Sequence, residues 1–134
     1  IFDRTIEDDG VKKGCKVIGL GIIAFCPLAQ GLLTDKYLHG IPSDSRIARD
    51  HRFLKESALT PERLHQIDEL NHLALERGQT LAQMALSWIL KDDEVASVLI
   101  GASRPEQIEE NISIVDHLDF TEEEIRKIDE ISLK

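Results

Sequence analysis

The chain has 134 residues, and its 16 Lys and Arg against 25 Asp and Glu give a formal net charge of −9 at pH 7. This acidic balance argues against a general nucleic-acid binder, because a phosphate backbone requires clustered Lys and Arg. The apolar runs fall far short of the roughly 20 residues that a transmembrane helix needs, so no membrane insertion is expected. Two cysteines are too few and too far apart for a zinc knuckle or a redox pair, which makes a reduced cytoplasmic compartment the default expectation. We expect one domain over residues 1–134.

The first third of the chain predicts one strand followed by a turn. The chain starts without an initiator Met and shows no signal peptide, so we expect a processed chain or a fragment. Residues 1–13 read as an irregular-to-helical lead-in. Val17–Cys26 is an apolar, β-rich run whose most strand-like part is Ile22–Cys26, and Pro27 ends it because proline cannot donate to a central ladder. Leu28–Leu38 then predicts a loop or a short helical turn.

A long polar stretch comes next, from residue 39 to residue 59. It contains Gly40, Pro42 and Ser43, and it is longer than a usual connection. We therefore expect it to be either disordered or a functional lid, a flexible loop over a bound ligand.

Two helices follow, each marked by its caps. Thr60 and Pro61 give an N-cap with proline in the first turn, and Gly78 gives a left-handed stop, which predicts a helix from residue 61 to about residue 77. Thr80 and Gln83 form a capping box for the second helix. The apolar face of that helix is expected to hold Leu81, Met84, Ala85 and Trp88.

The last third predicts a second strand and two more helices. Val95–Ile100 is a continuous apolar run, typical of a strand with both faces covered. A capping box over Ser103–Glu106 opens a helix with a core face of Ile108, Ile112 and Val115. The stretch Thr121–Glu124 caps a final helix buried through Ile125, Ile128 and Ile131. This order implies parallel strands with helical crossovers, and two strands alone make a poor sheet, so we expect part of a larger α/β structure.

The helix after the second strand is a candidate anion site. Arg104, Gln107 and Asn111 share one face at spacings of three and four, with Glu110 beside them. A helix N-terminus attracts anions, and the Ser103 hydroxyl with the Arg104 guanidinium would suit a ribose phosphate, while Gln107 and Asn111 could reach adenine edges. From spacing alone, a capped surface helix with polar residues in water is the commoner explanation.

The turn after the first strand is the second candidate. In Cys26-Pro27-Leu28-Ala29-Gln30-Gly31, the glycine permits close backbone approach and Leu28 could press on a flat ligand. Lys36 and Arg46 in the following stretch could clamp phosphates. Alone, this segment reads equally as an ordinary loop with solvated basic residues.

Two other patterns carry less weight. Gly19–Ala24 fits the G-x-G-x-x-A pattern of a Rossmann turn, but Pro27 interrupts the helix that this motif requires, and no acidic residue follows at the right distance. The five histidines form no metal-binding pattern, so no metal is expected. Lys36 and Tyr37 are sequence neighbours and do not make an acid–base pair.

Four segments together carry a family resemblance. They are Ile23–Tyr37, Gly40–Pro42, Ala82–Trp88 and Ser97–Asn111. In order and spacing they resemble the C-terminal part of the aldo-keto reductase family, closest to the branch of voltage-gated potassium channel β subunits and bacterial glyceraldehyde 3-phosphate/methylglyoxal reductases. The resemblance implies an incomplete (β/α)8 TIM barrel, with Val17–Cys26 as its seventh strand and Val95–Ile100 as its eighth.

The resemblance also implies NADPH at the carboxyl ends of those strands, and reduction of small aldehydes or ketones by hydride transfer. The implied contacts to the pyrophosphate and ribose are Cys26, Pro27, Leu28, Gln30 and Gly31. Lys36 and Arg46 match the loop over the cofactor, Gly101, Ser103 and Arg104 match the 2′-phosphate site, and Gln107, Glu110 and Asn111 match the adenine side. The family's catalytic Asp, Tyr, Lys and His come from early strands, so no catalytic residue is expected in this chain and these residues alone should be inactive.

A second class of function stays open. The chain could belong to a non-catalytic NADPH-sensing or channel-associated module, or to a half-barrel that self-associates. Unpaired strand edges of an incomplete barrel favour such homo-oligomers.

Overall fold

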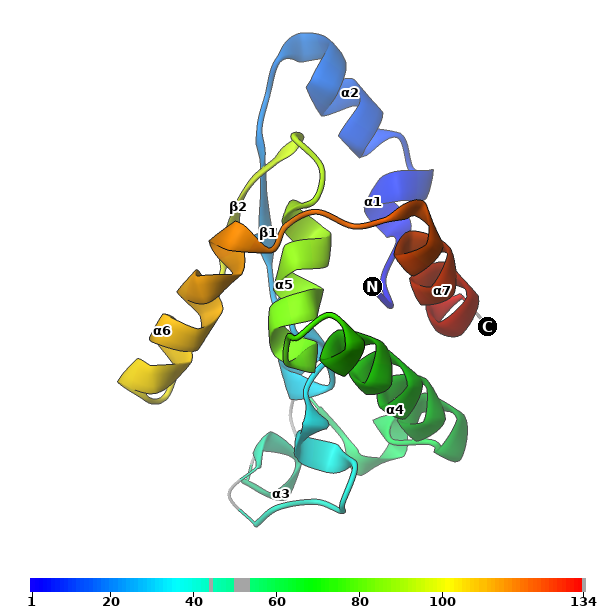
Figure 1. Cartoon of the computed structure of the whole chain (residues 1–134), viewed down its shortest axis with the longest axis vertical. Coiled ribbons are helices and arrows are strands. Elements are labelled where there is room, and N and C mark those ends of the chain that lie inside the picture. The colour runs from blue at the N-terminus through cyan, green and yellow to red at the C-terminus, as the bar shows by residue number, and fades with distance from the viewer. Residues whose placement is uncertain (44, 50–53, 134) are drawn as a thin grey trace.

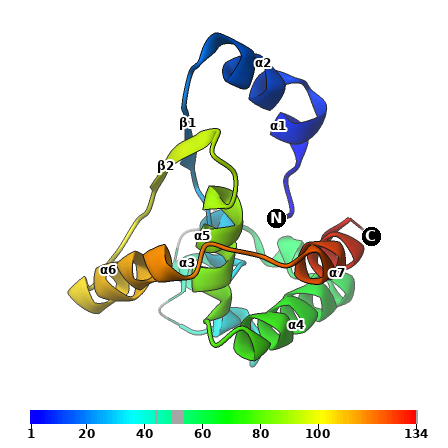
Figure 2. The same ribbon diagram turned by 45° about the horizontal axis from the view of Figure 1, so that its top comes forward.

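The structure is a computed structural model that describes residues 1–43, 45–49 and 54–133, without the side chain of Arg46. Its helices and strands are α1 Thr5–Asp8, α2 Val11–Ile18, β1 Ile22–Phe25, α3 Arg46–Arg49, α4 Pro61–Glu76, α5 Leu81–Leu90, β2 Val95–Leu99, α6 Pro105–Ile112 and α7 Glu122–Ser132. Short 3-10 turns lie at Ala29–Gly31, Asp35–Tyr37, Glu56–Ala58 and Ser113–Asp116. The two strands lie beside α5, and α4 packs against α7 (Figures 1 and 2). Helix α6 extends to one side.

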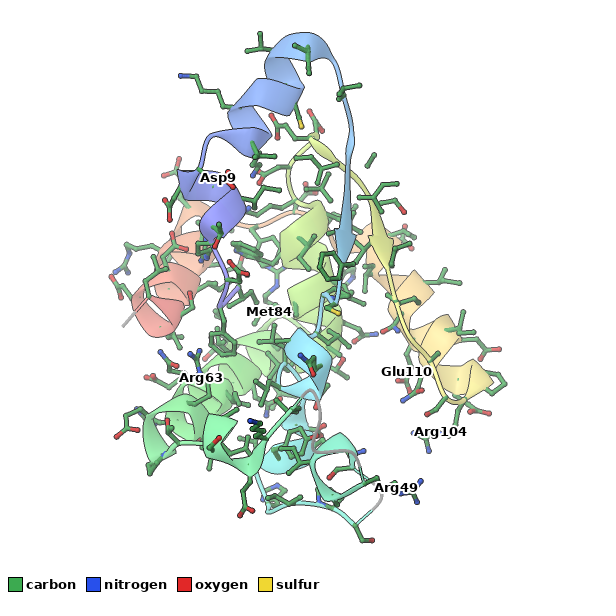
Figure 3. The ribbon with its side chains drawn as sticks, turned by 180° about the vertical axis from the view of Figure 1, so that it is seen from behind. Asp9, Arg49, Arg63, Met84, Arg104 and Glu110 are labelled. Atoms are coloured by element: carbon green, nitrogen blue, oxygen red, sulfur yellow. The ribbon has the colours of Figure 1, made fainter. Side chains whose placement is uncertain are left out.

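The core forms where α4, α5 and α7 meet. Each of these helices begins at a threonine whose side chain accepts a backbone N–H three residues on, as the sequence predicts. Gly78 adopts a φ of 69° just past the end of α4, which confirms the predicted left-handed stop. The fully buried members of this core include Ile67, Leu70, Met84 and Ile128, and Met84 lies in the middle of the molecule (Figure 3).

Arg77, at the end of α4, connects this helix to α7 directly and to α5 through Gln79. Its guanidinium lies 3.8 Å from the centre of the Phe120 ring and pairs with Glu124 of α7 at 2.7 Å. It also donates to the side-chain oxygen of Gln79 at 3.0 Å. The amide of Gln79 in turn donates to Ser87 of α5 at 3.0 Å. This partly buried network satisfies polar groups that would otherwise destabilise the packing of the three helices.

The strands β1 and β2 pair in parallel, as predicted. In the paired register Ala24 lies opposite Val98, and Phe25 lies opposite Leu99. Just before β1, a Cβ on Gly21 would lie 2.9 Å from the Cβ of Ala96. Close approach of the two backbones therefore explains this glycine. The Rossmann interpretation of the same motif is wrong, because a strand rather than a helix follows Gly21.

Three expectations about these elements are wrong. Val17 and Ile18 belong to the end of α2, which Gly19 closes with a φ of 72°, so the strand covers only the later part of the predicted run. The faces of β1 and β2 are largely open, with Phe25 77% exposed. The expected core face of α6 is also open, and Ile112 is 59% exposed. β-branched residues mimic a strand at the end of α2, and the apolar runs indicate surfaces suited to burial that the described residues leave uncovered.

The polar stretch from residue 39 to residue 59 contains folded pieces in its described part. Helix α3 and the 3-10 turn Glu56–Ala58 lie within it. Ile47 and Leu54 are buried and form a small second core with Tyr37. Residues 44 and 50–53 lie outside the described residues, so the role of this stretch as a lid stays a prediction.

Asp92 connects the N-terminal helices to the end of α5. Its carboxylate accepts hydrogen bonds from Lys12 of α2 and, at 2.7 Å, from Lys91. Partial burial raises the pKa of Asp92, but the bonds from the two lysines lower it by more, so its pKa stays below the ordinary 3.8.

This connection predicts how stability depends on pH. A carboxyl with a lowered pKa stabilises the fold at pH values above its unfolded pKa, and this contribution is lost as the pH falls through its folded pKa. Asp92→Asn should therefore unfold at lower urea concentration than the wild type at neutral pH, and the difference should shrink below pH 3.8. Urea titrations of the wild type and of Asp92→Asn at several pH values measure this difference in stability. A difference that grows toward acid pH would contradict the prediction.

Candidate cofactor site

The two predicted turns leave the sheet at the same end. Phe25 and Leu99 are paired, so Cys26 and Ile100 both begin at the carboxyl end of parallel strands. Barrel and open α/β proteins hold phosphorylated ligands at this end of the sheet. The sheet register therefore starts the two candidate segments at neighbouring positions, Cys26 and Ile100, although the segments lie far apart in the sequence.

The first turn, Cys26–Gly31, has an unusual backbone. Cys26, Ala29 and Gln30 have φ values of 51°, 47° and 61°, and Gly31 has a φ of 101°. Such conformations cost about 1–3 kcal/mol each for residues other than glycine and concentrate at functional sites. Backbone hydrogen bonds hold the turn: the N–H of Ala29 donates to the carbonyl of Cys26 at 3.0 Å, and the N–H of Gly31 donates to the carbonyl of Leu28 at 2.8 Å. The Thr34 hydroxyl donates to the carbonyl of Gly31 at 2.7 Å.

A cavity of about 720 Å³ lies between the N-terminal residues of the chain, β1, this turn and α5. Cys26, Pro27, Ala29 and Gln30 contribute to its wall, together with Trp88 of α5. Its volume lies within the range of small-molecule and cofactor sites. The side-chain oxygen of Gln30 is buried and has no hydrogen-bond donor among the described residues. A ligand hydroxyl is one group that would satisfy this oxygen.

The second turn is held by Gln107. The side-chain oxygen of Gln107 accepts the backbone N–H of Ser103 at 2.8 Å and that of Arg104 at 3.3 Å, and the Ser103 hydroxyl lies 3.2 Å away. The N-cap of α6 is Arg104 rather than the predicted Ser103, and Pro105 occupies the first helical position. The backbone N–H groups of Ser103 and Arg104 are therefore already bonded and are not free for an anion.

Arg104 is the open cation at this end of the sheet. Its guanidinium makes no hydrogen bond or ion pair with any residue in the described part of the chain. The residue is exposed and projects from the outer tip of α6, while Glu110 lies farther along the same helix (Figure 3). An exposed arginine without an acidic partner is suited to a phosphate group of a ligand.

The predicted site residues fall into two groups in space. Cys26, Pro27 and Gln30 line the cavity, and Leu28 and Gly31 lie in the same turn. Gly101, Ser103, Arg104 and Glu110 are exposed, while Gln107 and Asn111 are half-buried on α6. Lys36 is exposed in the 3-10 turn after the first group. The side chain of Arg46 lies outside the described residues.

Two residues that the sequence did not mark as site residues contribute to this region. Thr34 holds the carbonyl of Gly31, and a threonine three residues after a glycine turn is a weak signal for such a bond. Trp88 has a core position in the sequence pattern, but it also lines the cavity, and its indole N–H has no partner within the described chain. No pattern in the sequence predicts that second property.

Among the described residues, no cluster of three or more His, Cys, Asp and Glu side chains could hold a metal ion. Nor does any helix in that part of the chain have both the length and the apolar character to cross a membrane.

The fold and the paired turns define an α/β protein with a partial parallel sheet, of the kind found in (β/α)8 barrels. The chain belongs to the aldo/keto reductase family, whose model matches residues 1–133. This confirms the predicted family.

Its relatives lie in the predicted branch. L-glyceraldehyde 3-phosphate reductase of Escherichia coli K12 is 50% identical over 133 residues, covering 97% of this chain and 38% of that protein. A putative voltage-gated potassium channel subunit beta of Schizosaccharomyces pombe is 40% identical over 120 residues, covering 87% of this chain and 35% of that protein. The chain thus spans little more than a third of the length of these relatives.

A solved structure shows the same fold. Glycerol dehydrogenase from Gluconobacter oxydans is similar with a TM-score of 0.74 and 30% identity, over 97% of this chain and 39% of that protein. This similarity supports an incomplete barrel of the TIM type.

Proposed function

We propose that this chain is the cofactor-holding, C-terminal part of an NADPH-dependent reductase of small aldehydes and ketones. In this proposal β1 and β2 are the seventh and eighth strands of the barrel. The observation that carries the proposal is the placement of two turns at one end of a parallel sheet, one beside a cavity and one bearing an open arginine. The named activity of the E. coli relative supports the class of reaction.

The residues have distinct roles in this proposal. When bound, NADPH supplies the hydride that reduces the carbonyl carbon. The turn Cys26–Gly31 lies along its pyrophosphate and ribose, where a ribose hydroxyl would give the side-chain oxygen of Gln30 its missing donor. Arg104 and Ser103 hold the 2′-phosphate, with Gly101 allowing the turn to approach. Lys36 and Arg46 belong to the segment over the cofactor, and Glu110 and Asn111 flank the adenine.

The residues that move protons lie outside this chain in the proposal. Lys36 and Tyr37 do not replace them, because Tyr37 is buried in the small second core. A tyrosine elsewhere in the barrel would protonate the carbonyl oxygen as the hydride arrives. The proposal places the intact protein in the cytoplasm.

A second function is favoured by one comparison. The relative from S. pombe is named as a potassium channel subunit beta, so a regulatory module that senses NADPH without turnover is the alternative. Both functions need the same cofactor site, and only the first needs turnover. The open edges of β1 and β2 further suggest self-association of the isolated chain.

Turnover separates these possibilities. Oxidation of NADPH with methylglyoxal should be absent for the 134-residue chain and present for the full-length protein that contains it. Turnover by the chain alone would contradict the proposed absence of catalytic residues. NADPH binding without turnover by the full-length protein would favour the regulatory alternative.

A direct binding test uses the single tryptophan of the chain. Trp88 lines the cavity, and indole emission overlaps the absorption of reduced nicotinamide, so NADPH should quench this emission in a saturable way. Because the full-length protein can contain other tryptophans, a Trp88→Phe variant identifies this contribution. Equal quenching in the variant would contradict a cofactor beside Trp88.

A further inference from the structure

The side chain of Gln107 accepts hydrogen bonds from the backbone of the turn just before α6. Its side-chain oxygen lies 2.8 Å from the N–H nitrogen of Ser103, 3.3 Å from that of Arg104, and 3.2 Å from the Ser103 hydroxyl. A carbonyl oxygen has two lone pairs, so these three donors saturate it. While this arrangement holds, the oxygen cannot also accept a hydrogen bond from the amino group of an adenine.

The bonds fix the residue that carries the open cation. Arg104 is the N-cap of α6, and the N–H of Gln107 donates back to its carbonyl at 3.2 Å. Pro105 fixes the next backbone angle. The main chain of Arg104 is therefore held on both sides, while its guanidinium has no partner among the described residues. Ordering the backbone of Arg104 before binding reduces the entropy lost on binding.

The same arrangement of side chain and backbone begins two other helices of the chain, α5 and α7. Gln83 closes the capping box of α5 by accepting the N–H of Thr80 at 2.8 Å, and Glu124 does so for Thr121 of α7 at 2.7 Å. Glu124 shows that a carboxylate can replace the amide in this role. Gln83 also donates to the carbonyl of Glu110 on α6 at 3.1 Å, so Glu124, at the same helical position of α7, is the control that lies away from the proposed site.

We propose that the side-chain oxygen of Gln107 positions Arg104 and does not contact the adenine. This inference rests on the proposed function, in which Arg104 meets the 2′-phosphate. Gln107 then affects the affinity only for cofactors that carry the 2′-phosphate, and it does so only through the position of Arg104.

The test is a double-mutant cycle on the full-length protein, with dissociation constants for NADPH and NADH. Gln107→Met keeps the shape but removes the acceptor, and should weaken NADPH about fivefold, as for loss of a helix cap. The dissociation constant for NADH should change less than about twofold. In an Arg104→Ala background, Gln107→Met should change the dissociation constant for NADPH less than about twofold. Gln107→Glu should keep the Ser103 and Arg104 amides as protected from hydrogen exchange as in the wild type, whereas Gln107→Met should not. Glu124→Met, which removes the same kind of acceptor from α7, should leave the ratio of the two dissociation constants unchanged.

Other outcomes would overturn the inference. If Gln107→Met weakens NADPH and NADH equally, or by the same factor in the Arg104→Ala background, Gln107 contacts the shared part of the cofactor directly. If Gln107→Met leaves the affinity for NADPH unchanged, Gln107 has no role in binding this cofactor. These results leave the proposed function standing, whereas a wild type that does not bind NADPH would remove both.

Discussion

Arg104→Ala should weaken NADPH binding by about 1.5–3 kcal/mol, the range for hydrogen bonds to charged groups. This corresponds to roughly a ten- to hundred-fold rise in the dissociation constant. NADH should bind nearly as before, because it lacks the 2′-phosphate. The expected size follows from the structure: the N–H groups of Ser103 and Arg104 are already bonded to Gln107, so the guanidinium carries most of the phosphate recognition.

The matched control is Arg126→Ala. Arg126 is an exposed arginine on α7 that pairs with Glu130 at 2.5 Å, so its removal changes the net charge by the same amount at another place. Titration calorimetry with both cofactors should show no change for this variant. Equal losses of NADPH and NADH in Arg104→Ala would contradict the assignment of the 2′-phosphate.

Leu70→Ala should lower the free energy of unfolding by about 2–5 kcal/mol, the range for removing a buried leucine side chain. Leu70 has no exposed surface and lies on the face of α4 that belongs to the main core. The truncation leaves a cavity between helices that cannot fully collapse. Urea unfolding followed by circular dichroism measures the loss.

The same helix supplies the control for this prediction. Leu75 is 62% exposed, so Leu75→Ala should change the free energy of unfolding by less than about 0.5 kcal/mol. Similar losses for the two variants would show that α4 does not pack as described.

The sequence predicts the helical core well because its signals are local. Thr60, Thr80 and Thr121 each cap a helix through a bond to a residue three positions on, and Gly78 stops α4 through its own backbone angle. Such bonds depend only on neighbouring residues. The apolar spacing in α5 then places Met84 and Trp88 on the buried side.

The end of α2 shows where local signals fail. Val17 and Ile18 have high strand propensity, yet they complete a helix that Gly19 closes. The ion pair of Lys16 with Glu94, at 2.5 Å, joins this helix to the residue before β2, and that contact is not visible in the sequence.

The candidate site shows the same division. The capping pattern predicts the start of α6 one residue too early, at Ser103 instead of Arg104. The bonds of Gln107 to two backbone N–H groups depend on its side-chain conformation. The positive φ values of Cys26, Ala29 and Gln30 have no glycine to indicate them. The pairing of β1 with β2, which starts both turns at one end of the sheet, is long-range. The sequence indicates it only through the order of strands and helices.

Amide hydrogen exchange with and without NADPH tests most directly whether the two turns form one cofactor site. On the full-length protein, saturating NADPH should slow exchange in both Cys26–Gly31 and the segment from residue 101 to residue 111. NADH should protect the first segment to a similar degree and the second less. Protection of neither segment, or of one segment by both cofactors alike, would contradict a single site built from the ends of β1 and β2.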